Sequence, residues 1–270
     1  MNVSVVIASS RSNDLVKSCV ESLENQTVLP REIILVVDRH DQEEEFNLFF
    51  KNNNQNVFVY SSGGTGVTPA RNKGVFESGG EIIAFIDDDA TAMDTWIEEI
   101  TRTFQSNPGI EVVGGPVIPV FRGTPIDEKW YWIIGCTSTT PLTKRPISCN
   151  MAITRKSFNE VGGFDEVGRK RMKICMAEET ELCERIEEKI PGSITWNQDA
   201  LVYHNVPETR TRLRYMVNRA YKEGVGKAVI SERYPLGLEK SFLKYYLTHP
   251  DRYTLPVLLA TGLGFIRGRI

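Results

Sequence analysis

The sequence lacks several features that would assign it to a special class of protein. Its five cysteines are an odd number and form no Cys-x-x-Cys pair, so we expect neither a disulfide framework nor a zinc site, but a reducing compartment. The N-terminus has no basic region followed by an apolar leader, so no signal peptide is expected. The apolar stretch at residues 255–266 is shorter than the roughly 20 residues of a spanning helix. No internal repeat is evident, and the composition is that of an ordinary globular protein.

Charge is unevenly distributed along the chain. The formal net charge is −3, yet residues 201–270 hold 12 Lys and Arg against 5 Asp and Glu. A basic tail on an acidic body suggests contact with something anionic, such as a lipid surface, a phosphate or nucleic acid. A solvated basic helix explains the charge equally well. Nucleic acid is the least favoured partner, because no RNA- or DNA-binding motif accompanies the arginines.

The chain is organised around residues 81–89, where five apolar residues, Ile82 to Ile86, are followed by Asp87, Asp88 and Asp89. An apolar run without alternation is typical of a parallel strand covered on both faces. Buried charges are costly unless paired, so the carboxylates should lie just beyond the strand, where ligands of open α/β sheets bind. Such a place suits Mg²⁺ or Mn²⁺ carrying phosphate oxygens. A solvated acidic turn is the alternative.

A second acid is predicted at the same edge of the sheet. Residues 3–8 and 33–37 are short β-branched runs separated by a helical pattern, which indicates a βαβ unit, and the second run ends on Asp38. A carboxylate there could bind a nucleobase N–H or a ribose hydroxyl, or it could simply end the strand in a turn.

A helix is predicted to begin with Thr68 as N-cap and Pro69 at its first position, which puts Arg71 in the first turn. A cation there opposes the helix dipole, so we expect an anionic or carbonyl ligand for Arg71. The preceding glycines lack the spacing of a dinucleotide fingerprint. A further helix is predicted from Asp94 to Asn107.

Residues 116–146 are predicted to be an irregular, proline-rich loop that contains Trp130 and Trp132. Clustered aromatic rings can stack on sugars, or they can fill a gap in the core.

Three later residues are candidates for chemistry. Glu178 and Glu179 open a predicted helix, where acids favour the dipole, but a carboxylate in a cleft can also act as a general base. His204 follows a short strand, and is either a metal ligand or a satisfied imidazole.

The tail is predicted to contain a basic helix that breaks at Gly224 and Gly226, followed by the apolar residues 255–266 with basic flanks. This pattern fits a segment that lies on or dips into a bilayer, or a helix packed on its own domain.

In this order, the motifs resemble the family 2 glycosyltransferases of the GT-A fold. The resemblance covers residues 1–205 and is carried by four stretches: residues 3–38, residues 70–74 with 85–89, residues 149–152 with 161–165, and residues 178–182. It implies a mostly parallel α/β sheet flanked by helices as the catalytic domain, residues 1–205, with a basic amphipathic helical segment, residues 206–270, that can associate with a membrane.

The resemblance also implies residue roles. Glu179, or Glu178, is the catalytic base; the family usually has Asp at the position of Glu179. The other implied roles are nucleotide binding by Ala8, Asp38, Arg71, Asp87 and Asp88, metal binding by Asp89, Asp87 and His204, and acceptor binding by Trp130, Trp132 and Asn150. Arg39 stands where the family usually has a second Asp after Asp38.

The expected function is inverting transfer of a sugar, using Mn²⁺ or Mg²⁺, from a nucleotide diphosphate sugar, a UDP-sugar, to a hydroxyl of a lipid-linked acceptor such as a dolichyl-phosphate glycan. The expected location is the cytoplasmic face of a membrane, as a peripheral protein. Alternatives are direct transfer to a polyprenyl monophosphate and a non-catalytic binding module. A sugar-phosphate nucleotidyltransferase is disfavoured, because Ser9-Ser10-Arg11-Ser12 replaces its Gly-rich loop.

Overall fold

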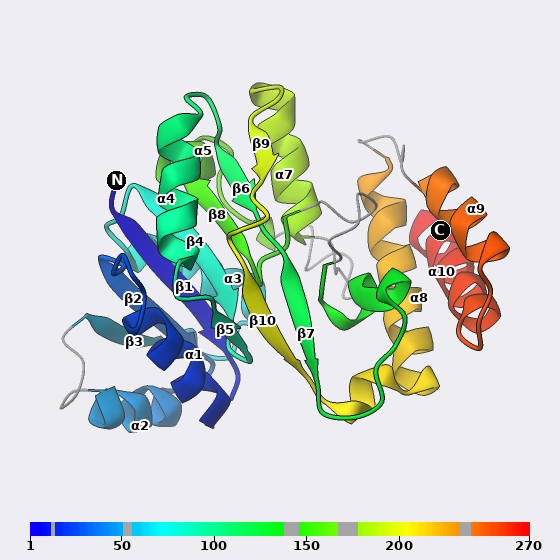
Figure 1. Cartoon of the computed structure of the whole chain (residues 1–270), viewed down its shortest axis with the longest axis horizontal. Helices are drawn as coiled ribbons and strands as arrows, with labels where there is room; N and C mark the ends of the chain where they lie inside the picture. The colour runs from blue at the N-terminus through cyan, green and yellow to red at the C-terminus, as the bar shows by residue number, and fades with distance from the viewer. Residues whose placement is uncertain (12–13, 51–55, 138–145, 167–177, 233–238) are drawn as a thin grey trace.

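The computed structural model describes residues 1–11, 14–50, 56–137, 146–166, 178–232 and 239–270. Its body is a seven-stranded sheet in the order β3-β2-β1-β4-β8-β6-β9 (Figure 1). The strands are β1 (Val3–Ser9), β2 (Glu32–Val37), β3 (Val57–Ser61), β4 (Ile82–Asp87), β6 (Val112–Gly114), β8 (Met151–Thr154) and β9 (Ile194–Trp196). Neighbouring strands pair in parallel except at β8, which is antiparallel to β4 and β6. The predicted mostly parallel sheet is therefore confirmed.

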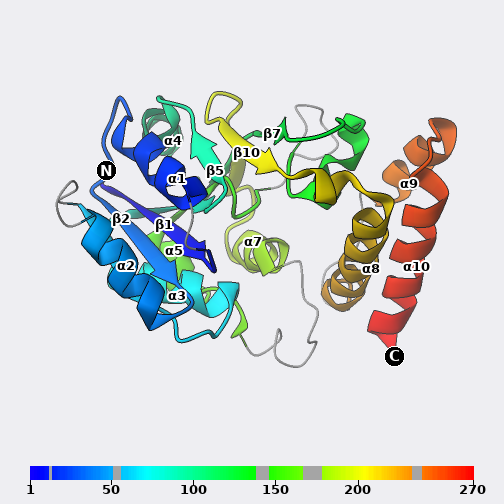
Figure 2. The ribbon, with the colours of Figure 1, turned by 90° about the horizontal axis from the view of Figure 1, so that it is seen from below.

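Helices cover both faces of this sheet, which explains why its strands carry apolar runs without alternation. Side chains of β1 alternate between two cores, with Val5 and Ile7 in one and Val6 in the other. Helices α1 (Asp14–Glu24), α2 (His40–Phe50) and α4 (Trp96–Ser106) contribute to the first core. Helices α3 (Val67–Glu77), α5 (Arg155–Glu160) and α7 (Glu178–Lys189) contribute to the second. Figure 2 shows α1 and α4 on the side of the sheet opposite α3 and α7.

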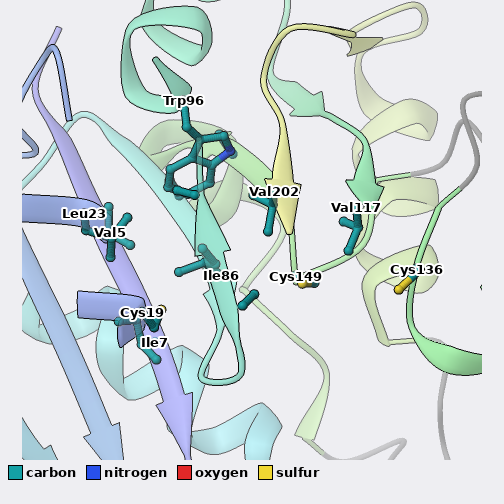
Figure 3. Packing of buried hydrophobic residues seen from close by; sticks show 14 of the residues in the cluster. Val5, Ile7, Cys19, Leu23, Ile86, Trp96, Val117, Cys136, Cys149 and Val202 are labelled. Atoms are coloured by element: carbon teal, nitrogen blue, oxygen red, sulfur yellow. The ribbon is translucent and has the colours of Figure 1, made fainter. Parts of the chain in front are cut away.

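A second sheet, in the order β5-β10-β7, extends the first core. Its strands are β5 (Ala90–Ala92), β7 (Val117–Phe121) and β10 (Val202–Val206). Figure 3 shows Val117 and Val202 of this sheet beside Ile86 and Trp96 of the main body, and all four side chains are buried. The strand β5 begins directly after the Asp triplet, so the second sheet continues from the edge where the acids lie.

Some predicted element boundaries are wrong. Helix α3 starts two residues before the predicted start, with Gly66 as its N-cap at φ 93°, a backbone conformation that glycine adopts without strain. Arg71 therefore lies beyond the first turn, and the dipole argument for its ligand loses its basis. The N-cap of α4 is Thr95, not Asp94. The loop at 116–146 contains β7 and the 3₁₀ helix η1 (Glu128–Ile134); residues 138–145 lie outside the described part.

The described residues of the tail form the 3₁₀ helix η3 (Glu208–Thr211) and the helices α8 (Leu213–Ile230), α9 (Glu239–Thr248) and α10 (Thr254–Arg269). The predicted break in α8 is wrong, because the helix runs through Gly224 and Gly226. A Cβ on Gly224 would lie 2.1 Å from the carbonyl oxygen of Thr261 in α10, so this glycine allows the two helices to pack closely. Within the described residues, no helix has the length and apolar character needed to cross a membrane.

Candidate functional site

The carboxyl ends of β1, β2 and β4 meet at one edge of the main sheet. Ala8 is the register partner of both Val36 and Asp87, which aligns these three strand ends. A cavity of about 320 Å³ opens at this edge. Six of the predicted site residues line it: Ala8, Asp38, Arg71, Asp87, Asp88 and Asp89. The structure therefore brings together every residue predicted to bind the nucleotide, along with both acids predicted to bind metal.

Asp89 is held by three cationic or imidazole side chains. Its Oδ1 lies 3.0 Å from Nε2 of His204, and its Oδ2 lies 2.8 Å from Arg11 Nη1 and 3.2 Å from Arg210 Nη2. Burial acts to raise the pKa of Asp89, but the hydrogen bond from His204 and the charges of Arg210 and Arg11 outweigh it, and the pKa is well below its usual range. Asp89 is therefore an ionised carboxylate at the cavity wall.

Asp88 has a different environment from Asp89. Burial raises the pKa of Asp88 to about 6, although the hydroxyl of Ser9 donates a hydrogen bond to it and Arg11 lies 2.7 Å away. Its carboxylate is directed at the loop after β1, so Asp88 fixes that loop against the end of β4.

Arg71 connects the Asp triplet to the two glutamates of α7. Its guanidinium lies 3.2 Å from Asp87 Oδ1, 3.3 Å from Glu178 Oε1 and 3.8 Å from Glu179 Oε1. The Arg71 side chain is only 8% exposed, so its ion pairs with Glu178 and Glu179, which are 14% and 18% exposed, are largely shielded from water. The hydroxyl of Ser148 also donates to Glu179. Both predicted base residues are thus fixed against Arg71, which also pairs with Asp87, but neither glutamate is among the residues that line the cavity.

Asp87 and His204 place ligand atoms within 4.8 Å of each other, as a divalent cation requires, whereas Asp89 contacts His204 but does not belong to this group. Carboxylate oxygens and an imidazole suit Mn²⁺, and two carboxylates suit Mg²⁺. The side chain of Asp87 is 35% exposed at the cavity. Cys149 has its sulfur within 4.8 Å of ligand atoms of Asp87 and His204, but burial raises the pKa of this thiol well above its usual value. Since metals bind the thiolate, Cys149 is a poorer ligand than the carboxylates.

Two of the predicted acceptor-binding residues are structural. Trp130 is 0% exposed, stacks on Tyr246 with ring centroids 4.7 Å apart, and donates from its indole nitrogen to Asp251. It fills the core, which was the alternative interpretation. Asn150 is 2% exposed. Its Oδ1 accepts a hydrogen bond from Trp96 Nε1, and its Nδ2 donates to two backbone carbonyls. Neither side chain has a surface or a free polar group for an acceptor.

Trp132 differs from Trp130, because its ring is only partly buried. Its indole nitrogen donates to the hydroxyl of Tyr246, and Lys227 Nζ lies 5.7 Å from the ring centroid. Acceptor binding by Trp132 stays a prediction.

Sequence reasoning did not identify Arg11, Arg210 or Cys136 as site residues. Arg11 and Arg210 line the cavity, and Cys136 Sγ lies 3.3 Å from Nδ1 of His204. Arg11 lies two residues after the end of β1, and this position near a strand end was a usable signal. Arg210 and Cys136 come from η3 and the segment after η1, and no spacing in the sequence connects them to the Asp triplet.

Solved structures share this fold along nearly the whole chain. The mannosyltransferase PcManGT from Pyrobaculum calidifontis, in complex with GDP-Man and Mn²⁺, has a TM-score of 0.65 and 14% identity, covering 99% of this chain and 81% of that one. TarS from S. aureus in complex with UDP-GlcNAc has a TM-score of 0.59 and 15% identity, covering 92% of this chain and 73% of that one. The predicted GT-A fold is thereby confirmed.

Sequence comparisons show the family. The glucosyl-dolichyl phosphate glucuronosyltransferase of Haloferax volcanii is 33% identical over 249 residues, which are 87% of this chain and 79% of that protein. The succinoglycan biosynthesis protein ExoM of Rhizobium meliloti is 25% identical over 58% of this chain and 50% of its own length. The family model of glycosyl transferase family 2 matches residues 4–162, which contain the Asp triplet, Asp38 and Arg71. With its acids at one sheet edge and this match over more than half of its length, the chain belongs to glycosyl transferase family 2.

Proposed function

We propose that the protein is an inverting, metal-dependent glycosyltransferase that moves a sugar from a UDP-sugar to a hydroxyl group of a lipid-linked acceptor. The convergence of Asp38, Arg71 and the Asp triplet on one cavity carries this proposal. The acceptor class is supported by the Haloferax relative, whose name specifies glucosyl-dolichyl phosphate. The fold and the family support the transferase reaction.

The donor would bind along the cavity. Asp38 would accept hydrogen bonds from the nucleoside, and the diphosphate would lie toward Asp87 and Asp89. Arg11 and Arg210, both beside Asp89, supply guanidinium donors that suit phosphate oxygens. Asp87, Asp89 and His204 would hold Mn²⁺ or Mg²⁺, which when bound supplies charge neutralisation for the departing diphosphate.

Glu179 would act as the general base. In one displacement, the acceptor oxygen bonds to the anomeric carbon, the bond from that carbon to the diphosphate oxygen breaks, and the acceptor proton passes to Glu179. Inversion follows from this single attack from the opposite side. The hydroxyl of Ser148 and the guanidinium of Arg71 fix the Glu179 carboxylate. Base catalysis of this kind typically contributes about 10² to 10⁴ in rate.

The test uses purified protein, Mn²⁺, glucosyl-dolichyl phosphate and a panel of UDP-sugars that includes UDP-glucuronic acid. We expect a lipid product whose new linkage has the anomeric configuration opposite to that of the donor, as measured by NMR. A product with retained configuration would contradict the inverting reaction. If removal of the metal with EDTA lowered neither the yield of product nor the rate of its formation, metal dependence would be contradicted.

Glu179→Gln separates the two acceptor classes. With a hydroxyl acceptor, the variant should lose about 10²-fold or more in turnover, because the proton has no base to accept it. With a polyprenyl monophosphate, whose oxygen is already ionised, the loss should be small. Glu184→Gln is the matched control, since position 184 lies on the same helix but about 140° around it from position 179. Donor binding with neither transfer nor hydrolysis would instead indicate a non-catalytic module.

We assign the protein to the cytoplasmic side of a membrane, as a peripheral protein. Four cysteines in the described residues, Cys19, Cys136, Cys149 and Cys183, are free and buried, which is typical of a reducing compartment. Residues 1–205 would be the catalytic domain, and residues 206–270 would form a helical segment that packs on it through Tyr246 and Tyr253 and adds Arg210 to the cavity. Thiol labelling of intact and opened cells with a cysteine introduced at an exposed position would test this location.

A further inference from the structure

Helix α10 exposes a stripe of large apolar side chains along its whole length. Leu255, Leu259, Leu263 and Ile266 are 57–68% exposed, and Ile270, which follows the helix, is 90% exposed. At about 100° per residue these positions fall within a sector of roughly 80°. We call these five residues the α10 stripe.

The opposite face of α10 is used for packing against α8. Val257, Ala260 and Gly264 are buried there, and a Cβ on Gly264 would lie 2.0 Å from the carbonyl oxygen of Tyr221. The close fit leaves no room for α10 to rotate about its axis and bury the stripe. When a helix carries apolar residues on two opposite faces and only one face packs on the protein core, the other face fits a second apolar environment.

The position of α10 makes this face available. Figure 2 shows α10 as the outermost helix at the end of the molecule opposite β2, with α8 between it and α7. Helix α9 adds two more exposed leucines one turn apart, Leu243 and Leu247, which are 49% and 62% exposed. An exposed row of apolar side chains such as the α10 stripe marks an interaction site.

The charge around the stripe identifies its partner. No acidic residue occurs between Thr254 and Arg269, while Arg267 and Arg269 lie in the last turn, on either side of the stripe. Lys244 lies between the two leucines of α9 and is also exposed. Leucines bordered by cations are the pattern of helices that lie in the interface of a bilayer with anionic headgroups.

We propose that the α10 stripe docks into the headgroup region of an anionic bilayer, with α10 parallel to the membrane plane. Arg267 and Arg269, which border the stripe, then lie at the level of the phosphate groups. The inference deepens the proposed function, since a lipid-linked acceptor is presented at such a surface. Its test does not need transferase activity, so the two proposals can fail independently.

The experiment is flotation of the purified protein with vesicles of phosphatidylcholine alone or of phosphatidylcholine with phosphatidylglycerol. We expect the protein to float with the anionic vesicles and much less with the neutral ones. The double variant Leu259→Ser/Leu263→Ser should lower binding at least about tenfold, because two buried leucines are removed from the contact. Arg267→Glu should weaken binding to anionic vesicles alone.

The matched control is Leu48→Ser/Phe76→Ser, which removes two side chains that are 73% and 84% exposed on α2 and α3. It should float like the unchanged protein. Circular dichroism melts should show all variants folded, because every changed side chain is exposed. Equal flotation of the stripe variant would overturn the proposal. The proposal would also be overturned if the unchanged protein did not bind vesicles and light scattering showed it to be a dimer that the stripe variant does not form. A second copy of the chain would then cover the stripe. UDP-sugar hydrolysis, measured separately, tests the proposed function.

Discussion

Nε2 of His204 lies 3.0 Å from Oδ1 of Asp89, although 115 positions separate the two residues in the chain. The contact arises because β5 begins directly after Asp89 and pairs antiparallel with β10, with Ala90 opposite His204. The backbone N–H of Asn205 also donates to the carbonyl oxygen of Asp89. The second sheet therefore fixes the third acid of the triplet at the wall of the cavity.

Asp89→Asn should lower transferase turnover at least about 100-fold, because an amide keeps the shape of the side chain but cannot supply a charged metal ligand. Calorimetric titration with Mn²⁺ should show weaker binding in the same variant. Asp94→Asn is the control, since Asp94 is an exposed acid five residues further along the chain. Unchanged Mn²⁺ binding and turnover in Asp89→Asn would remove the metal assignment.

Replacing Arg71 with methionine should destabilise the protein by about 3–5 kcal/mol, the usual cost of leaving buried charges without their partner. Asp87, Glu178 and Glu179 would all lose the same cation. The measurement is urea unfolding at neutral pH. Arg31→Met serves for comparison, because Arg31 is 52% exposed and 3.8 Å from Glu32, and it should change stability by less than about 1 kcal/mol. Similar losses for both variants would show that Arg71 has no special structural role.

Gly264→Ala should lower the melting temperature clearly, whereas Gly262→Ala on the same helix should leave it unchanged or raise it slightly. A Cβ at position 264 would overlap the backbone of α8, while nothing lies within 4 Å of a Cβ at position 262. Alanine also stabilises a helix by about 1 kcal/mol relative to glycine, and at position 262 this is the only effect that we expect. Thermal melts of the two variants check this directly. Equal melting temperatures would mean that α8 and α10 do not pack closely in solution.

Asp251 should give the protein a stability contribution that depends on pH. Burial acts to raise the pKa of Asp251, but hydrogen bonds from Trp130 and Lys129 outweigh it, so the pKa is lower in the folded state than in the unfolded state. The folded state then binds fewer protons, and stability is lost as the pH falls below about 4. Asp251→Asn should be less stable by about 1 kcal/mol at neutral pH.

The difference between Asp251→Asn and the unchanged protein should shrink as the pH falls, since protonation removes the charge from Asp251 in both states. Urea unfolding at several pH values measures this difference. A difference that stays constant with pH would assign the effect to packing around Trp130 and not to charge.

The edge of the sheet could be predicted because its signals are local. Uninterrupted apolar runs that end on Asp38 and Asp87 indicate buried parallel strands, and parallel strands in one sheet must end at one edge. One arginine at the cavity, Arg210, could not be predicted from local signals. Arg210 reaches Asp89 only because η3 follows β10, and β10 lies beside β5, which is a property of the tertiary fold.

The sequence also did not reveal which aromatic side chains are buried or how the helices of the tail pack. Trp130 and Trp132 lie two positions apart in one aromatic cluster, yet only Trp130 is fully buried, because Tyr246 and Tyr253 of the tail pack around it. Gly224 suggested a break in a helix, since an isolated helix is weakened by glycine. Its actual reason is the neighbouring α10, whose approach no property of residues 213–230 reveals.

The place of β8 has a consequence for how the protein is made. Strand β6 is synthesised before β8, yet β8 separates it from β4 in the finished sheet. A growing chain that ends before Met151 therefore holds β4 with a bare hydrogen-bonding edge and β6 with nothing to join. Such edges are templates for aggregation, so a chain of this length exposes pairing surface that the finished sheet conceals.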